Sequence, residues 1–263
     1  MLTDLCQLGT DETAAPAAVF PSASPSVRAN WRRLDYLAHG NERQRSAHAL
    51  LTAGVWDALA AQCADMALVS TLAIGLDRPG SDLDILCQHP DPAAFVATFA
   101  EQGWQASAKG DNIWLLERVF PCAADSGCDN SIASWPLELY VTPAPIETLN
   151  GWRHLTLMAA LLQHFGDAFY REVLRLRLEQ GLKGEAAMCR LLGLAGDPYA
   201  ALLTLEGRNL AELSWQPPSR DGMHKFTDAA AMAPVVQPSS LVVSTTSATP
   251  VCPVSTESPT PTS

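Results

Sequence analysis

The chain has 263 residues, of which 48% are hydrophobic, and its formal net charge at pH 7 is −11. This apolar content is enough for a hydrophobic core, whereas the acidic excess argues against strong binding to nucleic acids, whose phosphates are held by clustered Lys and Arg. The start of the chain does not resemble a signal peptide, and we find no apolar run of about 18 residues that could cross a membrane. Seven cysteines without a C-x-x-C pair are typical of reduced thiols, so we expect a cytoplasmic protein.

The two ends of the chain differ in composition from its middle. Residues 11–28 are rich in Ala, Pro and Ser, and the last part of the chain is rich in Pro, Ser, Thr and Val. Such segments cannot bury enough apolar area to offset a backbone ordering cost of about 1–2 kcal/mol per residue. We therefore predict disordered segments at residues 1–28 and 215–263.

The predicted ordered body begins with helices. Apolar residues between Trp31 and Leu59 recur at a spacing of three to four, which predicts two amphipathic helices interrupted near Gly40. Four short apolar or alternating runs then predict strands, at residues 66–69, 83–87, 112–119 and 136–141. The pattern predicts an α/β core over residues 29–148.

A further helix and a helical extension complete this body. Asp91 as N-cap, Pro92 in the first turn and Gly103 beyond the end predict a helix over residues 91–102. From residue 149 to about residue 205 the apolar spacing is helical throughout. We expect residues 149–214 to form a helical extension packed on the α/β core.

Two aspartates in the second predicted strand form a candidate metal site. Successive side chains of a strand point to opposite faces, so Asp82 and Asp84 share one face while Leu83 turns toward the core. At a rise of about 3.3 Å per residue, both carboxylates can converge on one hard cation such as Mg²⁺. The alternative is an edge strand that carries two solvated aspartates.

A third acid lies in the last predicted strand. Glu138 lies on the face opposite Leu137 and Leu139, so a neighbouring strand could direct its carboxylate toward Asp82 and Asp84. Three converging acids repel one another without a cation, and such a cluster can hold Mg²⁺ or Mn²⁺. The alternative is that Glu138 is only the polar position of a half-buried strand.

Two sets of motifs resemble known families. Ser70 and Thr71, ten intervening residues and Asp82-Leu83-Asp84 resemble the signature of the nucleotidyltransferase superfamily with the polymerase-β-like fold. Several longer phrases resemble the bacterial family called domain of unknown function 4269, at residues 40–44, 74–77, 80–85, 152–154, 181–185 and 192–199. This second similarity covers about residues 30–206.

The superfamily resemblance implies a fold and a set of ligands. The fold would be α/β, with a small mixed sheet of nucleotidyltransferase type, N-terminal helices and the helical C-terminal extension. Asp82, Asp84 and Glu138 would be catalytic metal ligands, and a nucleoside triphosphate would be the substrate.

A nucleotide-binding set follows from the same resemblance. Ser70 and Thr71 would hold the triphosphate at a helix start, where free N–H groups favour anions. We add Ser81, and also Arg153, which could contact phosphate or could be one of several polar residues on a solvated helix. Superfamily members usually carry Gly where Ser70 stands, which lets the backbone approach phosphate closely.

Three functions fit these observations. The first is Mg²⁺-dependent transfer of a nucleotidyl group from a nucleoside triphosphate to a hydroxyl on a small molecule or protein. The second is a catalytically weak or inactive member of the fold that acts as a nucleotide sensor or interaction module, with Ser70 as the hint. The third is a structural α/β domain with solvated acids.

Overall fold

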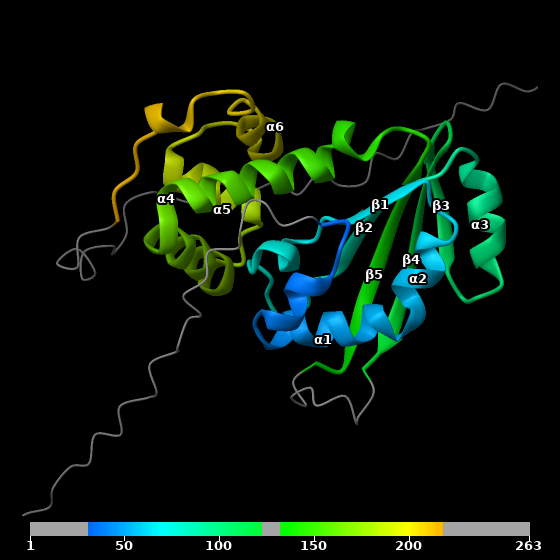
Figure 1. Ribbon diagram of the computed structural model, residues 1–263. Coiled ribbons are helices and arrows are strands. Elements are labelled where there is room, and N and C mark those ends of the chain that lie inside the picture. Colours follow the sequence, from blue (N-terminus) through cyan, green and yellow to red (C-terminus); the bar gives the residue numbers. More distant parts are fainter. Residues whose placement is uncertain (1–30, 123–131, 218–263) are drawn as a thin grey trace, which may run out of the picture. The chain divides into compact units, whose positions relative to one another are not determined.

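The computed structural model describes residues 31–122 and 132–217 (Figure 1). The predicted disordered segment at residues 1–28 lies outside these ranges, as does the predicted tail from residue 218 onward. The first residues of that predicted tail are described, and the Trp215 ring centroid lies 5.1 Å from that of Phe169. Among the helices of the described ranges, none combines the length and apolar character needed to cross a bilayer.

The N-terminal helices form as the apolar spacing predicts. They are a short 3₁₀ helix, an α-helix, a π-type turn and a second α-helix: η1 (Asp35–His39), α1 (Glu42–Leu50), η2 (Leu51–Val55) and α2 (Trp56–Ala60). Asn41 caps α1, because its side chain accepts from the Gln44 N–H while the Gln44 side chain accepts from the Asn41 N–H. The interruption predicted near Gly40 is therefore confirmed.

Five strands form one mixed sheet: β1 (Asp65–Leu68), β2 (Leu83–Gln88), β3 (Gln105–Gly110), β4 (Ile113–Pro121) and β5 (Ser134–Thr142). Their order is β1-β2-β5-β4-β3, with β2 and β5 parallel and all other neighbours antiparallel. The predicted α/β class and mixed sheet are confirmed, and the arrangement is consistent with a nucleotidyltransferase-like fold. The prediction lacked β3, whose Gln, Ala, Ser, Lys and Gly residues are mostly exposed and carry no strand signal.

One face of the sheet is a hydrophobic core. β2 and β5 bury alternate residues on this face, among them Leu83, Ile85, Leu137 and Leu139. The fully buried Trp135 of β5 donates from its indole to the Ser46 hydroxyl of α1, at 3.0 Å. The predicted helix at residues 91–102 is α3 (Pro92–Ala100), which contacts β3, β4 and β5. This burial leaves the intervening residues of β2 and β5 on the opposite face.

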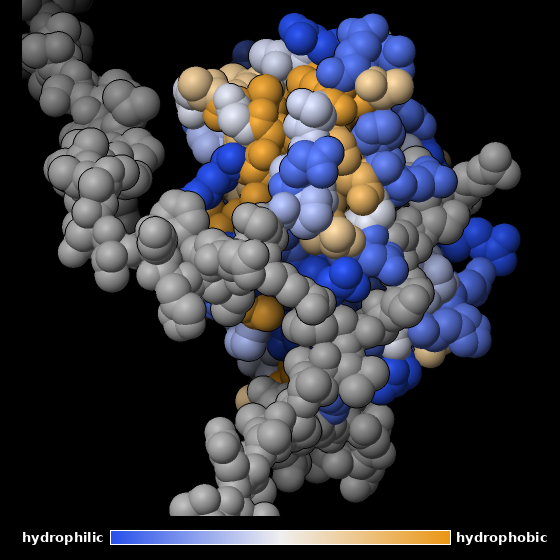
Figure 2. Space-filling view, turned by 90° about the vertical axis from the view of Figure 1, so that its left-hand side faces the viewer, coloured by the Kyte–Doolittle hydropathy of each residue, from blue (hydrophilic) through white to orange (hydrophobic). Residues whose placement is uncertain are grey.

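The helical extension consists of α4 (Asn150–Gln180), α5 (Gly184–Leu192) and α6 (Pro198–Leu203), which Figure 1 shows grouped together. The uninterrupted helical pattern is wrong at Gly166, where φ is 72° and ψ is −163°, and α4 changes direction. At its start, α4 contacts the second sheet face, since a Cβ on Gly151 would lie 3.6 Å from Cδ2 of Leu86 on β2. Figure 2 shows apolar residues among hydrophilic ones on the face that it presents.

Candidate active site

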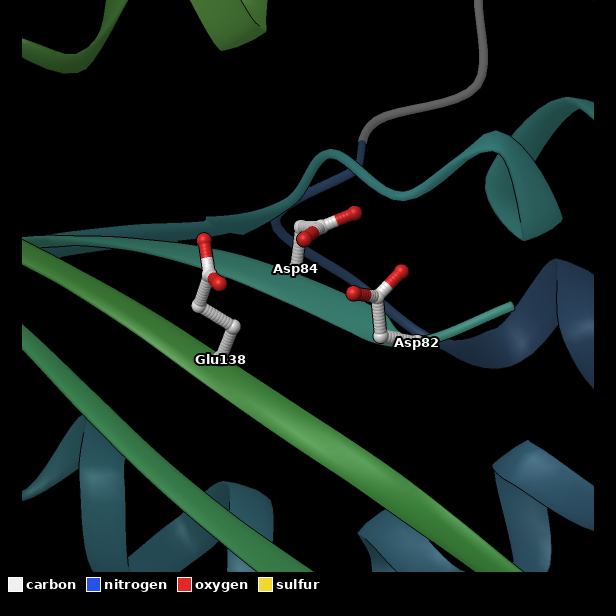
Figure 3. A group of neighbouring side chains, drawn as sticks. All are labelled: Asp82, Asp84 and Glu138. Carbon is white, nitrogen blue, oxygen red and sulfur yellow. The ribbon is translucent and has the colours of Figure 1, made fainter. Parts of the chain in front are cut away.

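Three carboxylates meet on the sheet face opposite the core (Figure 3). Asp82 comes directly before β2, Asp84 lies on β2 and Glu138 lies on β5. One carboxylate oxygen from each of these residues lies within 4.8 Å of the corresponding oxygens of the others. The sheet thus brings together the three acids that the sequence singled out.

The parallel pairing of β2 with β5 produces this convergence. Asp84 and Glu138 are direct partners in the register, and both are partly buried. Direct neighbours on parallel strands lie about 4.8 Å apart, so their side chains stand next to each other on one face. Asp82, two residues before Asp84, extends the cluster toward the exposed start of the strand.

The cluster is electrostatically unfavourable as it stands. Burial, followed by the negative charges of Asp82, Glu138 and Glu185, raises the pKa of Asp84 to about 7. Burial, followed by the charges of Asp82 and Glu117, also raises the pKa of Glu138. No ion pair joins the three acids to a cation within the described ranges, although the Lys183 ammonium lowers both pKa values from a greater distance.

The donor set fits a divalent hard cation. Carboxylate oxygens are the ligands that Mg²⁺ prefers, and two strands hold them at a mutual distance that one ion can bridge. A bound cation would compensate the repulsion that raises the pKa of Asp84. Asp82, Asp84 and Glu138 could therefore hold Mg²⁺ or Mn²⁺.

A cavity of about 640 Å³ opens beside the acids. It lies between the sheet and the helical extension, with walls from β2, β5, α4 and α5. Its polar and charged lining residues are Thr71, Asp84, Glu138, Tyr140, Thr148, Asn150, His154, Glu185 and Tyr199. The volume is sufficient for a ligand of nucleotide size.

Ser70 and Ser81 serve the loop that leads into β2. Ser70 is 1% exposed, and its hydroxyl donates to the Asp82 carbonyl oxygen at 2.7 Å. The Ser70 hydroxyl oxygen also accepts from the Leu72 N–H, so Ser70 caps the short 3₁₀ helix η3 (Thr71–Ile74). Ser81 accepts from the Arg78 N–H at 3.0 Å. Neither serine lines the cavity, and both instead position the chain around Asp82.

Thr71 does line the cavity, and it has a partner that the sequence interpretation missed. The Thr71 hydroxyl accepts a hydrogen bond of 3.2 Å from Nη2 of Arg177, a residue of α4 that is 4% exposed. Arg177 lies among other charged residues on a long helix, and its local sequence does not distinguish it from a solvated residue. Only the packing of α4 against η3 shows that this arginine is buried.

Arg153 lies away from the acids. It forms an exposed ion pair with Glu206 and donates to the Asn150 side chain. Both ion-pair partners line a second cavity of about 290 Å³, whose lining does not include any of the three acids. The structure therefore does not bring Arg153 together with the other predicted site residues.

Comparisons with known proteins give remote structural similarities. Three solved structures of Cid1 match with TM-scores of 0.38–0.40 and identities of 13–14%. They are a complex with the short product ApU, a complex with the UTP analog UMPNPP, and a structure described as the Cid1 poly(U) polymerase. The matches cover 65% of this chain, which spans about half (52%) of the length of those chains.

The sequence comparisons are more direct. No curated protein matches the chain. A family model described as a domain of unknown function, DUF4269, matches residues 48–205. This segment is more than half of the chain and contains the three acids, the cavity and most of the helical extension. The chain therefore belongs to the DUF4269 family.

Proposed function

We propose that the chain is a Mg²⁺-dependent nucleotidyltransferase that transfers a nucleotidyl group from a nucleoside triphosphate to a hydroxyl acceptor. The observation that carries this proposal is the convergence of Asp82, Asp84 and Glu138 within 4.8 Å of one another, with Asp84 and Glu138 in the wall of a cavity. The spacing of Thr71 from Asp82 and Asp84, which resembles the superfamily signature, supports the same reaction.

The reaction forms a bond between the acceptor oxygen and the α-phosphorus. The bond from that phosphorus to the bridging oxygen of the β-phosphate breaks, pyrophosphate leaves, and the acceptor hydroxyl gives its proton to solvent. Bound Mg²⁺ would supply neutralisation of phosphate charge and stabilisation of the leaving pyrophosphate. Asp82, Asp84 and Glu138 would hold that ion, and Thr71 borders the same cavity on the side of the helices.

The charge of the molecule supports a small-molecule or protein acceptor. The net charge of the chain is −11, with 28 Asp and Glu residues against 17 Lys and Arg residues. A polyanionic nucleic acid would be repelled at such a surface. The acceptor therefore needs a hydroxyl group but not a phosphate backbone.

The position of Ser70 removes the main argument for lost activity. Its side chain is buried and bonded to the Asp82 carbonyl, so it does not occupy the cavity where phosphate would lie. The sensor function, which rested on Ser70, has no further support in the described residues. Arg153 is left out of the proposed nucleotide site because Glu206 already pairs with it.

Thermal unfolding tests the proposal. We expect a nucleoside triphosphate with Mg²⁺ or Mn²⁺ to raise the Tm of the wild-type protein, because a ligand bound only by the folded state stabilises it. The double variant Asp82→Asn, Asp84→Asn should lose the metal-dependent part of this shift, so that its Tm in the presence of the nucleotide is the same with and without the metal ion. Pyrophosphate release on addition of hydroxyl compounds then separates transfer from binding alone.

Glu117 provides a matched control. It is the direct neighbour of Glu138 on β4, and it is exposed and outside the cluster of three acids. Glu117→Gln should keep the shift, because it removes acidic charge without removing a metal ligand. The proposal fails if the wild type shows no shift, or if Glu117→Gln abolishes it as completely as the double variant.

A further inference from the structure

Arg177 is a buried cation without a counter-ion. It is 4% exposed, it forms no ion pair within the described ranges, and its Nε lacks a hydrogen-bond partner. Arg43 differs, since its Nε lies 2.5 Å from the buried carboxylate of Asp77. A guanidinium buried without a compensating charge is strongly unfavourable. A buried arginine of this kind lowers the stability of the folded protein unless a bound anion compensates its charge.

The first turn of α5 lies directly beside this cation. A Cβ on Gly184, the first residue of α5, would lie 3.3 Å from Arg177 Nη1 and 3.6 Å from Thr71 Cγ2. The N-cap residue Lys183 makes no side-chain capping bond, so the N–H groups of this first turn have no cap. The positive end of the helix dipole and the buried guanidinium thus lie together.

Both elements reach the cavity. Thr71, which accepts from Arg177, and Glu185, in the first turn of α5, both line it. Burial and the positive charge of Arg78 lower the pKa of Arg177, whereas the charges of Glu185 and Asp77 act in the opposite direction without pairing with it. The part of the cavity that is lined by Thr71 and the first turn of α5 therefore lies next to a buried positive charge.

We propose that this side of the cavity is a polyphosphate site that receives the phosphate chain of the nucleotide. The Thr71 hydroxyl and the uncapped N–H groups of α5 would contact the phosphate oxygens. Arg177 would act behind them as a positioning residue, orienting Thr71 through its hydrogen bond and supplying the buried positive charge. This assignment rests on the proposed nucleotidyltransferase function and adds the residues that select a phosphate chain.

The test uses inorganic tripolyphosphate in EDTA, so that neither a base, a sugar nor a metal contributes. The protein is the Asp82→Asn, Asp84→Asn variant, which lacks the acids that would repel the probe. We expect calorimetric binding of tripolyphosphate, and at least a tenfold loss of affinity when Arg177→Met is added. Arg177→Lys, which keeps the charge, should restore part of the affinity.

Two further variants separate a binding role from a structural one. Arg177→Met alone should have a Tm equal to or above that of the wild type, because it removes a buried unpaired charge. Glu185→Gln should bind tripolyphosphate more tightly, because it removes a like charge from the site. The proposal is overturned if the acid-depleted protein does not bind tripolyphosphate, or binds it equally with and without Arg177.

Failure of this site can be distinguished from failure of the proposed function. If the wild type transfers nucleotides while Arg177→Met leaves both KM and kcat unchanged, only the polyphosphate site is wrong. If tripolyphosphate binding requires Arg177 but no metal-dependent transfer is found, the polyphosphate site stands without that reaction. Where transfer is found, we expect Arg177→Met to raise KM for the nucleotide more than it lowers kcat.

Discussion

Two groups of opposite charge lie near the cavity, and neither is compensated by an ion pair within the described ranges. On the sheet, Asp82, Asp84 and Glu138 converge without an ion-pair partner. On the helical side, Arg177 is buried without one. Elsewhere in the same fold, Arg43 and the buried Asp77 do pair. The difference is consistent with our proposals, in which the unpaired charges meet ligands of opposite sign, whereas the pair of Arg43 and Asp77 stabilises the structure.

The largest expected effect comes from breaking the paired charge. Arg43→Met would leave the Asp77 carboxylate, whose side chain is 2% exposed, without its counter-ion. We expect a loss of about 3–5 kcal/mol in the free energy of unfolding, measured by urea denaturation. Arg177→Met should cost nothing by the same measurement. Equal losses in the two variants would contradict the distinction between paired and unpaired arginines.

The acid cluster predicts a pH dependence of smaller size. The pKa of Asp84 is raised from 3.8 to about 7, so the folded state favours the protonated carboxyl. Its contribution to stability is fully present below pH 3.8 and is lost as the pH rises through about 7. We expect a loss of about 1–3 kcal/mol from this group after solvent screening, measured in EDTA.

Two additions sharpen this prediction. Asp84→Asn should flatten the dependence of the free energy of unfolding on pH, because the amide does not titrate. Mg²⁺ should stabilise the wild type more at pH 8 than at pH 5.5, since the metal competes with the proton for the carboxylate. An unchanged pH profile in Asp84→Asn would assign the titration to another group.

Ser70 is hydrogen-bonded to the backbone of Asp82, a member of the acid cluster, so its substitution should have a moderate effect on stability and on the response to Mg²⁺. Ser70→Ala removes the hydrogen bond to the Asp82 carbonyl, at an expected cost of about 1 kcal/mol and a weaker response of the Tm to Mg²⁺. Ser107→Ala is the matched control, because the Ser107 hydroxyl is buried without a hydrogen-bond partner. If both variants behave alike, Ser70 does not position Asp82.

The smallest effect is expected at the exposed ion pair of Arg153 and Glu206. Arg153→Ala should leave the free energy of unfolding nearly unchanged, as is usual for surface pairs. The Tm shift with nucleoside triphosphate and Mg²⁺ should be the same as in the wild type. Loss of this Tm shift in Arg153→Ala would show that Arg153 belongs to the nucleotide site, as the sequence interpretation predicted.

Local patterns predicted most of the fold. The N-cap at Asp91 and the alternation along β2 and β5 appear in the structure where they were expected, because they depend on residues close in sequence. β3 was missed because pairing with β4, and not the intrinsic preference of its residues, makes it a strand. Gly166 was missed because a single glycine inside a helical pattern does not by itself indicate a break.

The sequence by itself determined that Asp82 and Asp84 share one strand face. It also determined that Glu138 points to the strand face opposite that of its apolar neighbours Leu137 and Leu139. These relations follow from the period of a strand, which is local. Only the tertiary structure decided that β5 lies parallel beside β2, with Glu138 in register with Asp84, and that Arg177 is buried behind Thr71. Strand order and helix packing bring together residues that are distant in the chain. The local periodicity of the sequence therefore cannot predict these contacts.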